Sequence, residues 1–176
     1  GVAFYRAYHL GVPADLPPLP VQYADFALWQ QTWLQSTELA AQRAYWRTHL
    51  ADAPATLALP TDYPRPPVQT FAGAIVERTL PLDLTAALQQ LSRQQAVSLF
   101  MTLYAAFAVL LARYSDQSDL VFGTTVANRR RQETEGLIGF FANTLPLRIA
   151  VGDNPRFIDL LQRVRHLTLD AYAHQD

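Results

Sequence analysis

The chain has 176 residues, half of them hydrophobic and 16% charged, with a formal net charge of −1. This composition is typical of a folded globular protein, and the charge gives no electrostatic argument for nucleic acid or an anionic membrane as a partner. Because the chain contains no cysteine and no lysine, disulfides, thiolate chemistry, cysteine-ligated metals and lysine-based catalysis are excluded.

The first third alternates helical patterns with proline-rich connections. Residues 3–9 are predicted to end a helix, and residues 13–20, with four prolines, to form a stiff extended connection. Aromatic and aliphatic residues at helical spacing predict helices over residues 23–34 and 38–50. Repeated prolines across residues 54–67 predict a loop.

The middle of the chain predicts one strand and two helices. Residues 71–80 are rich in β-formers and predict a strand. Asp83 is the expected N-cap of the next helix, and Ser98 that of the one after. The second helix is apolar on most sides, which predicts that it is buried. One face of this helix is predicted to carry an apolar stripe, namely Leu99, Leu103, Phe107, Leu110 and Tyr114.

The last third predicts two strands and a helix. Residues 120–127 and the alternating residues 145–151 predict strands, and Asn154 before Pro155 predicts a helix start. That helix is predicted to carry one apolar stripe, namely Phe157, Leu160, Leu161, Val164, Leu167 and Ala171. The predicted order is αα–β–αα–β–loop–β–α, a mixed α/β fold. Three strands are few for this length, which indicates a sheet completed by sequence outside this chain.

The polar candidates for a site are few. No pair of the four histidines has metal-ligand spacing, so no metal site is predicted. His174 lies four residues after Asp170, a spacing that suits an ion pair or a capping contact on one helical turn. Arg129, Arg130 and Arg131 form either a solvated loop or a contact for phosphate, whose geometry guanidinium matches.

Residues 137–148 join a glycine-aromatic loop to a strand, a pattern that indicates part of a functional site. Asn143 stands at the join, where its amide either orients a substrate carbonyl or amine, or satisfies loop backbone groups. Upstream, the aromatic stripe that includes Trp29 indicates core packing, and Asp25 is expected to cap its helix or to hold an arginine.

Five segments together resemble motifs of the condensation domains of nonribosomal peptide synthetases. Residues 17–30 resemble the proline-rich lead-in and Y-x-D-[FY]-A-x-W, in which Tyr23, Asp25 and Trp29 match. Residues 45–66 resemble YW…LP-x-D-x-x-RP, and residues 123–129 resemble G-x-x-V-A-[GN]-R. Residues 138–148 resemble I-G-x-F-V-N-T-L-x-x-R, with alanine in place of the usual valine. His174 to Asp176 resemble the start of H-Q-D-x-P-F-E.

The resemblance implies a chloramphenicol-acetyltransferase-like fold of two lobes around a tunnel. Residues 1–20 would be the end of the first lobe and the proline-rich connection, and residues 21–176 the second lobe, incomplete at its C-terminal end. The family's catalytic HHxxxDG motif would lie upstream, since this chain contains no His-His pair. We therefore expect no catalytic residue within this chain and no activity from it alone.

The implied activity of the parent is formation of an amide bond between a donor acyl or peptidyl thioester and an acceptor aminoacyl thioester. Both are carried on phosphopantetheine arms of carrier domains, so no covalently bound cofactor is expected. The implied partners are carrier domains and neighbouring modules with their adenylation domains, in the cytoplasm, without nucleic acid or membrane.

Residue by residue, the resemblance implies that Asn143 and Gly139 position substrates, with Gly139 letting its loop approach the tunnel. Arg148 is implied to be structural or near the site mouth. His174 and Asp176 are implied to be structural contacts.

Three alternatives stay open. The first is a carrier-docking or scaffold module without turnover. The second is an epimerisation domain, which shares the fold but usually lacks the His-Gln-Asp ending. The third is an α/β domain of an unrelated acyltransferase.

Overall fold

The computed structural model describes residues 2–14 and 16–175, and its elements agree with most of the predicted boundaries. The N-terminal helices are α1 (Val2–Leu10), α2 (Tyr23–Trp33) and α3 (Thr37–His49). In the middle lie α4 (Leu82–Gln94) and α5 (Leu99–Ser115). The strands β1 (Asp119–Val126) and β2 (Asn143–Ala150) flank the short α6 (Gln132–Glu135), and α7 (Phe157–Ala173) ends the chain.

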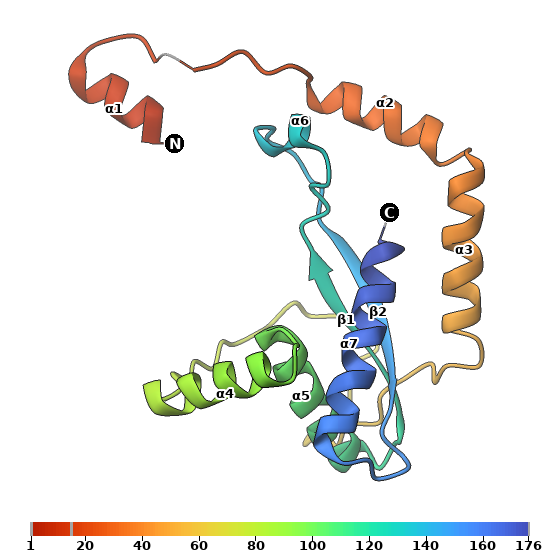
Figure 1. The fold of residues 1–176 in the computed structure, drawn as a ribbon. Coiled ribbons are helices and arrows are strands. Elements are labelled where there is room, and N and C mark those ends of the chain that lie inside the picture. The colour runs from red at the N-terminus through yellow and green to blue at the C-terminus, as the bar shows by residue number, and fades with distance from the viewer. Residues whose placement is uncertain (1, 15, 176) are drawn as a thin grey trace.

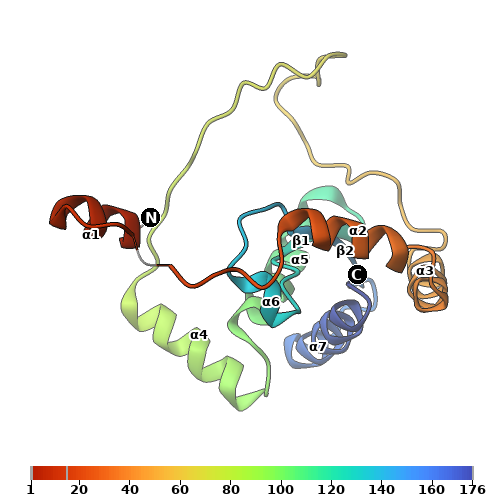
Figure 2. The same cartoon turned by 90° about the horizontal axis from the view of Figure 1, so that it is seen from above.

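The core lies between the sheet and two long helices. β1 and β2 form an antiparallel pair in which Asp119 lies opposite Ala150 and Val126 opposite Asn143. Helices α5 and α7 pack on this pair and on each other, while α2 lies above the pair and α3 beside it (Figures 1 and 2). The predicted alternation is confirmed, because Leu145, Leu147 and Ile149 are buried.

Helix α7 confirms its predicted apolar stripe over most of its length. Leu160, Leu161 and Val164 are almost fully buried, and Ala171 closes the stripe near the C-terminal end. Among the residues of this stripe, Phe157, at the first helical position, is the one that is partly exposed. Burial of such side chains stabilises the fold by roughly 1.5–3 kcal/mol each.

The predicted N-cap Asp83 is wrong. Helix α4 begins at Leu82, with Pro81 as its N-cap, two residues before the predicted cap. Proline fixes φ near the helical value and thereby starts the helix before Asp83 is reached. The Asp83 carboxylate therefore lies in the first turn, where the helix dipole favours it.

The predicted helix start at Asn154 is also wrong. Asn154 has a φ of 46°, a left-handed turn conformation that asparagine tolerates and that no N-cap residue adopts. Helix α7 begins at Phe157 after Arg156, whose side chain pairs with Asp159 in the first turn at 2.8 Å.

The predicted strand over residues 71–80 is absent from the described structure. Ile75 is 88% exposed and Val76 is 79% exposed. A strand needs the backbone of a neighbour to complete its hydrogen bonds. Among the described residues no segment pairs with this one, so two strands are seen instead of three.

The burial predicted for helix α5 is confirmed on one face and wrong on the other. Met101, Tyr104, Ala105 and Leu111 face the core. Four members of the predicted stripe are instead substantially exposed, namely Leu103, Phe107, Leu110 and Tyr114. The predicted cap Ser98 is confirmed, since its Oγ accepts a hydrogen bond from the Met101 amide.

Candidate functional site

Asn143 lies at the first residue of β2, beside the C-terminal end of α7. Its Nδ2 donates a hydrogen bond of 2.8 Å to the backbone oxygen of Gln175, and its Oδ1 accepts one of 2.9 Å from the Thr144 amide. The side chain thus joins two of the motifs noted in the sequence, residues 138–148 and 174–176. These contacts agree with the second of its two predicted roles, hydrogen bonding to backbone groups. The Asn143 amide also lies where the two motifs meet.

Phe141 is the buried centre of the glycine-aromatic loop that precedes Asn143. The ring of Tyr23 meets it edge-on at 5.3 Å, and the ring of Phe26 lies 4.7 Å away. The Arg129 guanidinium covers the same ring at 4.2 Å. The loop is therefore held by α2 on one side and by the end of β1 on the other.

Gly139 makes a close approach to Tyr23. A β-carbon at Gly139 would lie 2.5 Å from Cε2 of Tyr23, a distance that no side chain could accept without movement. The Tyr23 hydroxyl also donates a hydrogen bond of 2.9 Å to the Phe140 carbonyl. In the described structure the close approach at Gly139 is made to helix α2, and its approach to the tunnel stays a prediction.

Asp25 caps helix α2, one of its two predicted roles. Its carboxylate accepts a hydrogen bond of 2.8 Å from the Gln22 amide and completes a reciprocal capping box with the Gln22 side chain. This arrangement fixes the start of the helix that carries Tyr23 and Trp29.

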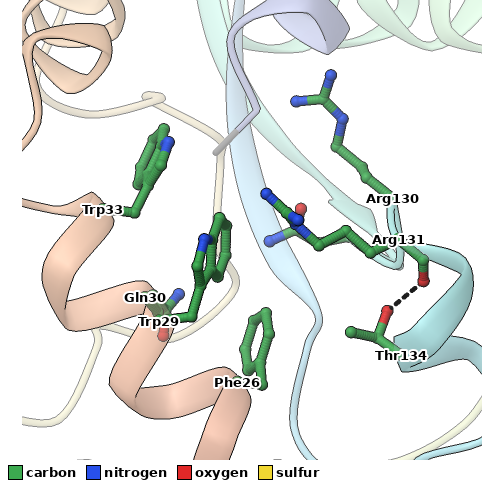
Figure 3. A pocket seen from close by; sticks show the side chains of 8 residues that line it. Phe26, Trp29, Gln30, Trp33, Arg130, Arg131 and Thr134 are labelled. Carbon is green, nitrogen blue, oxygen red and sulfur yellow. Dashed lines mark hydrogen bonds between the residues drawn. The ribbon is translucent and has the colours of Figure 1, made fainter. Parts of the chain in front are cut away.

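The three consecutive arginines have different surroundings. Arg129 turns inward, where its guanidinium donates to the carbonyls of Thr134 and Leu137. Arg131 instead lies over the indole of Trp29, with its guanidinium carbon 4.2 Å from the ring centre. Arg130 and Arg131 both line a pocket of about 360 Å³ against α2 (Figure 3).

His174 belongs to an aromatic stack that ties α3 to the end of α7. Its ring lies parallel to that of Tyr45 at 3.9 Å, and His49 stacks on Tyr45 at 5.5 Å. The Trp46 indole donates a hydrogen bond of 2.7 Å to the His174 carbonyl. The His174 ring contacts the backbone oxygen of Asp170, not its carboxylate, so the predicted ion pair is replaced by a capping contact. The predicted contact at Asp176 lies outside the described residues.

Arg148 secures the same C-terminal end of α3 that carries the aromatic stack. Its guanidinium pairs with Asp119 at 2.7 Å and donates to the carbonyls of His49 and Ala51. The hydrogen bonds from Arg148 lower the pKa of the Asp119 carboxyl. This arrangement is structural, which was one of the two implied roles.

His49 was missed by the sequence reasoning. Its Nε2 accepts a hydrogen bond of 3.3 Å from the Arg148 amide, and burial lowers its pKa, with a further lowering from the Arg148 charge and a smaller opposing effect of Asp170. Its position four residues after Tyr45 was the available signal, because residues at that spacing share a helix face.

No group of three or more His, Asp or Glu side chains among the described residues could hold a metal ion. In the same part of the chain no single helix has the length and apolar character to cross a membrane, although α4 and α5 together, bent by 103°, meet that test.

Comparison with known proteins supplies the family. Residues 2–176 match the condensation domain family. The chain belongs to this family. Among curated proteins, this condensation domain sequence is 54% identical to a linear gramicidin synthase protein of Brevibacillus parabrevis over 175 residues, which is 99% of the chain and 2% of that protein. It is 46% identical to phosphinothricin tripeptide synthetase PhsC of Streptomyces viridochromogenes, covering 99% of the chain and 16% of that protein.

Solved structures agree with the fold. The X-domain from teicoplanin biosynthesis superimposes with a TM-score of 0.89 at 31% identity, covering 98% of this chain and 40% of that one. The first condensation domain of the CDA synthetase gives a TM-score of 0.80 at 22% identity, covering 98% and 38%. The chain therefore has the chloramphenicol-acetyltransferase-like fold implied by its motifs. It spans a small part of its curated relatives and about two fifths of these solved chains.

Proposed function

We propose that this chain is part of a condensation domain whose parent forms amide bonds between two carrier-bound thioesters. The amine of the acceptor attacks the thioester carbonyl of the donor, a C–N bond forms and the C–S bond breaks. The amine's proton leaves with the released thiol. We further propose that this reaction takes place in the cytoplasm, with carrier and adenylation domains as partners.

The observation that carries the proposal is the family match over residues 2–176 together with the position of Asn143. Attack on a thioester needs two reactants held in line and donors near the developing oxyanion. We propose that Asn143 fixes the junction of β2 and α7, and that this junction forms a tunnel wall which orients the arms. Gly139 contributes by letting Tyr23 pack against the same loop.

We also propose the lobe assignment, with residues 1–20 as the end of the first lobe and its connection, and residues 21–176 as the incomplete second lobe. The proton-handling group would come from an HHxxxDG motif elsewhere in the parent. On this proposal the 176 residues alone catalyse nothing.

A carrier-loaded assay of the parent protein tests the proposal. Donor and acceptor carriers are loaded with their thioesters, and the acceptor carrier is analysed by mass spectrometry. The proposal expects a new amide-linked thioester on the acceptor. A parent that binds both loaded carriers and transfers nothing would contradict it.

One observation favours a second candidate, a docking module without turnover. Among the most similar folds is a solved structure described as the complex of the X-domain and OxyB from teicoplanin biosynthesis, with a TM-score of 0.88 and 30% identity. The same assay separates the two, because a docking module binds its partner but yields no amide. An epimerisation-type relative would instead invert a carrier-bound residue without joining two.

A further inference from the structure

A pocket of about 360 Å³ opens between helix α2 and the segment that follows β1. One wall is aromatic, with Phe26, Trp29 and Trp33 on α2 facing the space (Figure 3). The opposite wall is polar and consists of Asn128, Arg130, Arg131 and Thr134, with Gln30 completing the lining. None of these described lining residues is acidic, although Glu133 and Glu135 follow on α6.

The Arg131 guanidinium is held at the boundary between the two walls. It lies 4.2 Å from the centre of the Trp29 ring, which shields one of its faces from water. The backbone beneath it is also fixed, because the Arg131 carbonyl accepts a hydrogen bond of 2.7 Å from the Thr134 hydroxyl. A guanidinium stacked in this way still presents its N–H groups at its edge, where a phosphate can accept two of them.

The two walls together suit one kind of group, a phosphate ester with a branched apolar carbon close beside it. Phosphopantetheine has this structure, since its phosphate is joined through one methylene to a carbon that bears two methyl groups. The indoles of Trp29 and Trp33 can cover those methyl groups while the arginines meet the phosphate. Inorganic phosphate, which has no apolar part, would use only the polar wall.

We infer that this pocket binds the phosphate end of a carrier's phosphopantetheine arm, with Arg131 as the main phosphate contact and Trp29 as the apolar support. This inference rests on the proposed function, because that function supplies the arm. It also gives the three consecutive arginines different roles. Arg129 contacts the Phe141 ring and donates to loop carbonyls, while Arg130 and Arg131 line the pocket.

The test uses the complete condensation domain of the parent, because isolated condensation domains of this fold have been crystallised. The protein is labelled with fluorotryptophan, and the Trp29 and Trp33 signals in the fluorine NMR spectrum are assigned by Phe substitution. The probes are pantetheine phosphate, pantetheine and inorganic phosphate. We expect a saturable shift of the Trp29 signal with pantetheine phosphate. Pantetheine and inorganic phosphate should each bind with an affinity about tenfold lower, since each lacks one of the two contacts.

Variants then identify the phosphate contact. Arg131→Gln is expected to weaken the binding of pantetheine phosphate by about tenfold, which is the effect of losing one charge-assisted hydrogen bond. Arg43→Gln, on the exposed side of α3, is the matched control and should bind as the wild type does. Equal affinity for pantetheine and its phosphate, or full affinity in Arg131→Gln, would overturn the inference. The comparison of probes on the wild type decides the matter even if a variant fails to fold.

This titration and the carrier-loaded assay together separate this inference from the proposed function. If the parent forms amide product while pantetheine phosphate leaves the Trp29 signal unmoved, the pocket inference fails and the function stands. If the Trp29 signal shifts as expected and the parent forms no amide, the function fails and the phosphate site stands.

Discussion

The ring of Tyr23 occupies the space that a β-carbon at Gly139 would need. The two residues are 116 positions apart, and Cε2 of Tyr23 lies 2.5 Å from the ideal position of that carbon. Tyr23 begins helix α2, and Gly139 lies in the loop before β2. Their contact is one of the attachments by which α2 is held to the rest of the fold, together with the hydrogen bond to Phe140.

Gly139→Ala is expected to displace Tyr23 and weaken the attachment of α2. Tyr23→Ala should remove the clash, so the double variant should be less destabilised than the sum of the two single variants. The free energy of unfolding of the complete domain, measured in urea for all four proteins, gives the coupling. Additive effects would show that the contact does not constrain this loop.

Tyr23→Phe isolates the hydrogen bond from the ring packing. The variant keeps the contacts with Gly139 and Phe141 but loses the bond to the Phe140 carbonyl, at a cost of up to about 1 kcal/mol. The same urea titration measures it. A loss as large as that of Tyr23→Ala would mean that packing contributes little.

Asn143→Ala is expected to loosen the end of α7. It removes the hydrogen bond to the Gln175 carbonyl, worth about 1 kcal/mol, and the one from the Thr144 amide. Amide hydrogen exchange should rise at residues 172–175, and amide product should form more slowly in the parent. Gln90→Ala, an exposed amide on α4, is the control. Slower catalysis without any change in exchange would instead favour direct substrate contact by the amide.

The lowered pKa of His49 predicts that the folded domain loses stability in mild acid. Its pKa in the folded protein lies below the ordinary value of 6.5, because burial and the Arg148 charge disfavour the imidazolium, while Asp170 opposes them. The unfolded chain then binds the proton more readily, so the stability that neutral His49 contributes is complete above pH 6.5 and is lost as the pH falls below it.

The measurement is the free energy of unfolding of the complete domain at pH 7.5 and pH 5.5. The decrease on acidification should shrink in His49→Gln and persist in His166→Gln, an exposed histidine on α7. An undiminished decrease in His49→Gln would assign the effect to other groups.

The outer face of α5 predicts self-association of the 176-residue chain by itself. Leu103 is 44% exposed and Phe107 and Leu110 are each 49% exposed along one side of the helix. Such a continuous apolar face is typical of a surface that another protein segment covers. Sedimentation should show aggregates, and Leu103→Glu with Leu110→Arg should reduce them. A monodisperse monomer that melts cooperatively would contradict this expectation.

The sequence predicted the elements whose burial is decided locally. The alternation of Leu145, Leu147 and Ile149 and the stripe along α7 require only a periodic pattern, and both are confirmed. The two faces of α5 are both apolar, so the periodicity could not tell which one meets the core. That choice depends on where α7 and β1 lie.

Contacts between distant segments explain why the strand predicted over residues 71–80 is wrong and why some residues of the candidate site were not predicted. A strand's propensity cannot supply its neighbour, and in the described residues Ile75 and Val76 have none. The stack of His49, Tyr45 and His174 joins residues more than 120 positions apart, so no local pattern predicts it. Asn143 was found because its amide stands at a loop–strand junction, a local feature.

We propose that the parent of this chain joins two carrier-bound thioesters and that Asn143 supports that reaction. Single-turnover transfer between loaded carriers, followed by mass spectrometry of the acceptor thioester, tests both parts of this proposal. We expect amide product with the wild-type parent and slower formation with Asn143→Ala, while Gln90→Ala matches the wild type. No amide product from a wild-type parent that binds both loaded carriers would contradict the function. An unchanged rate in Asn143→Ala would contradict the role assigned to that residue.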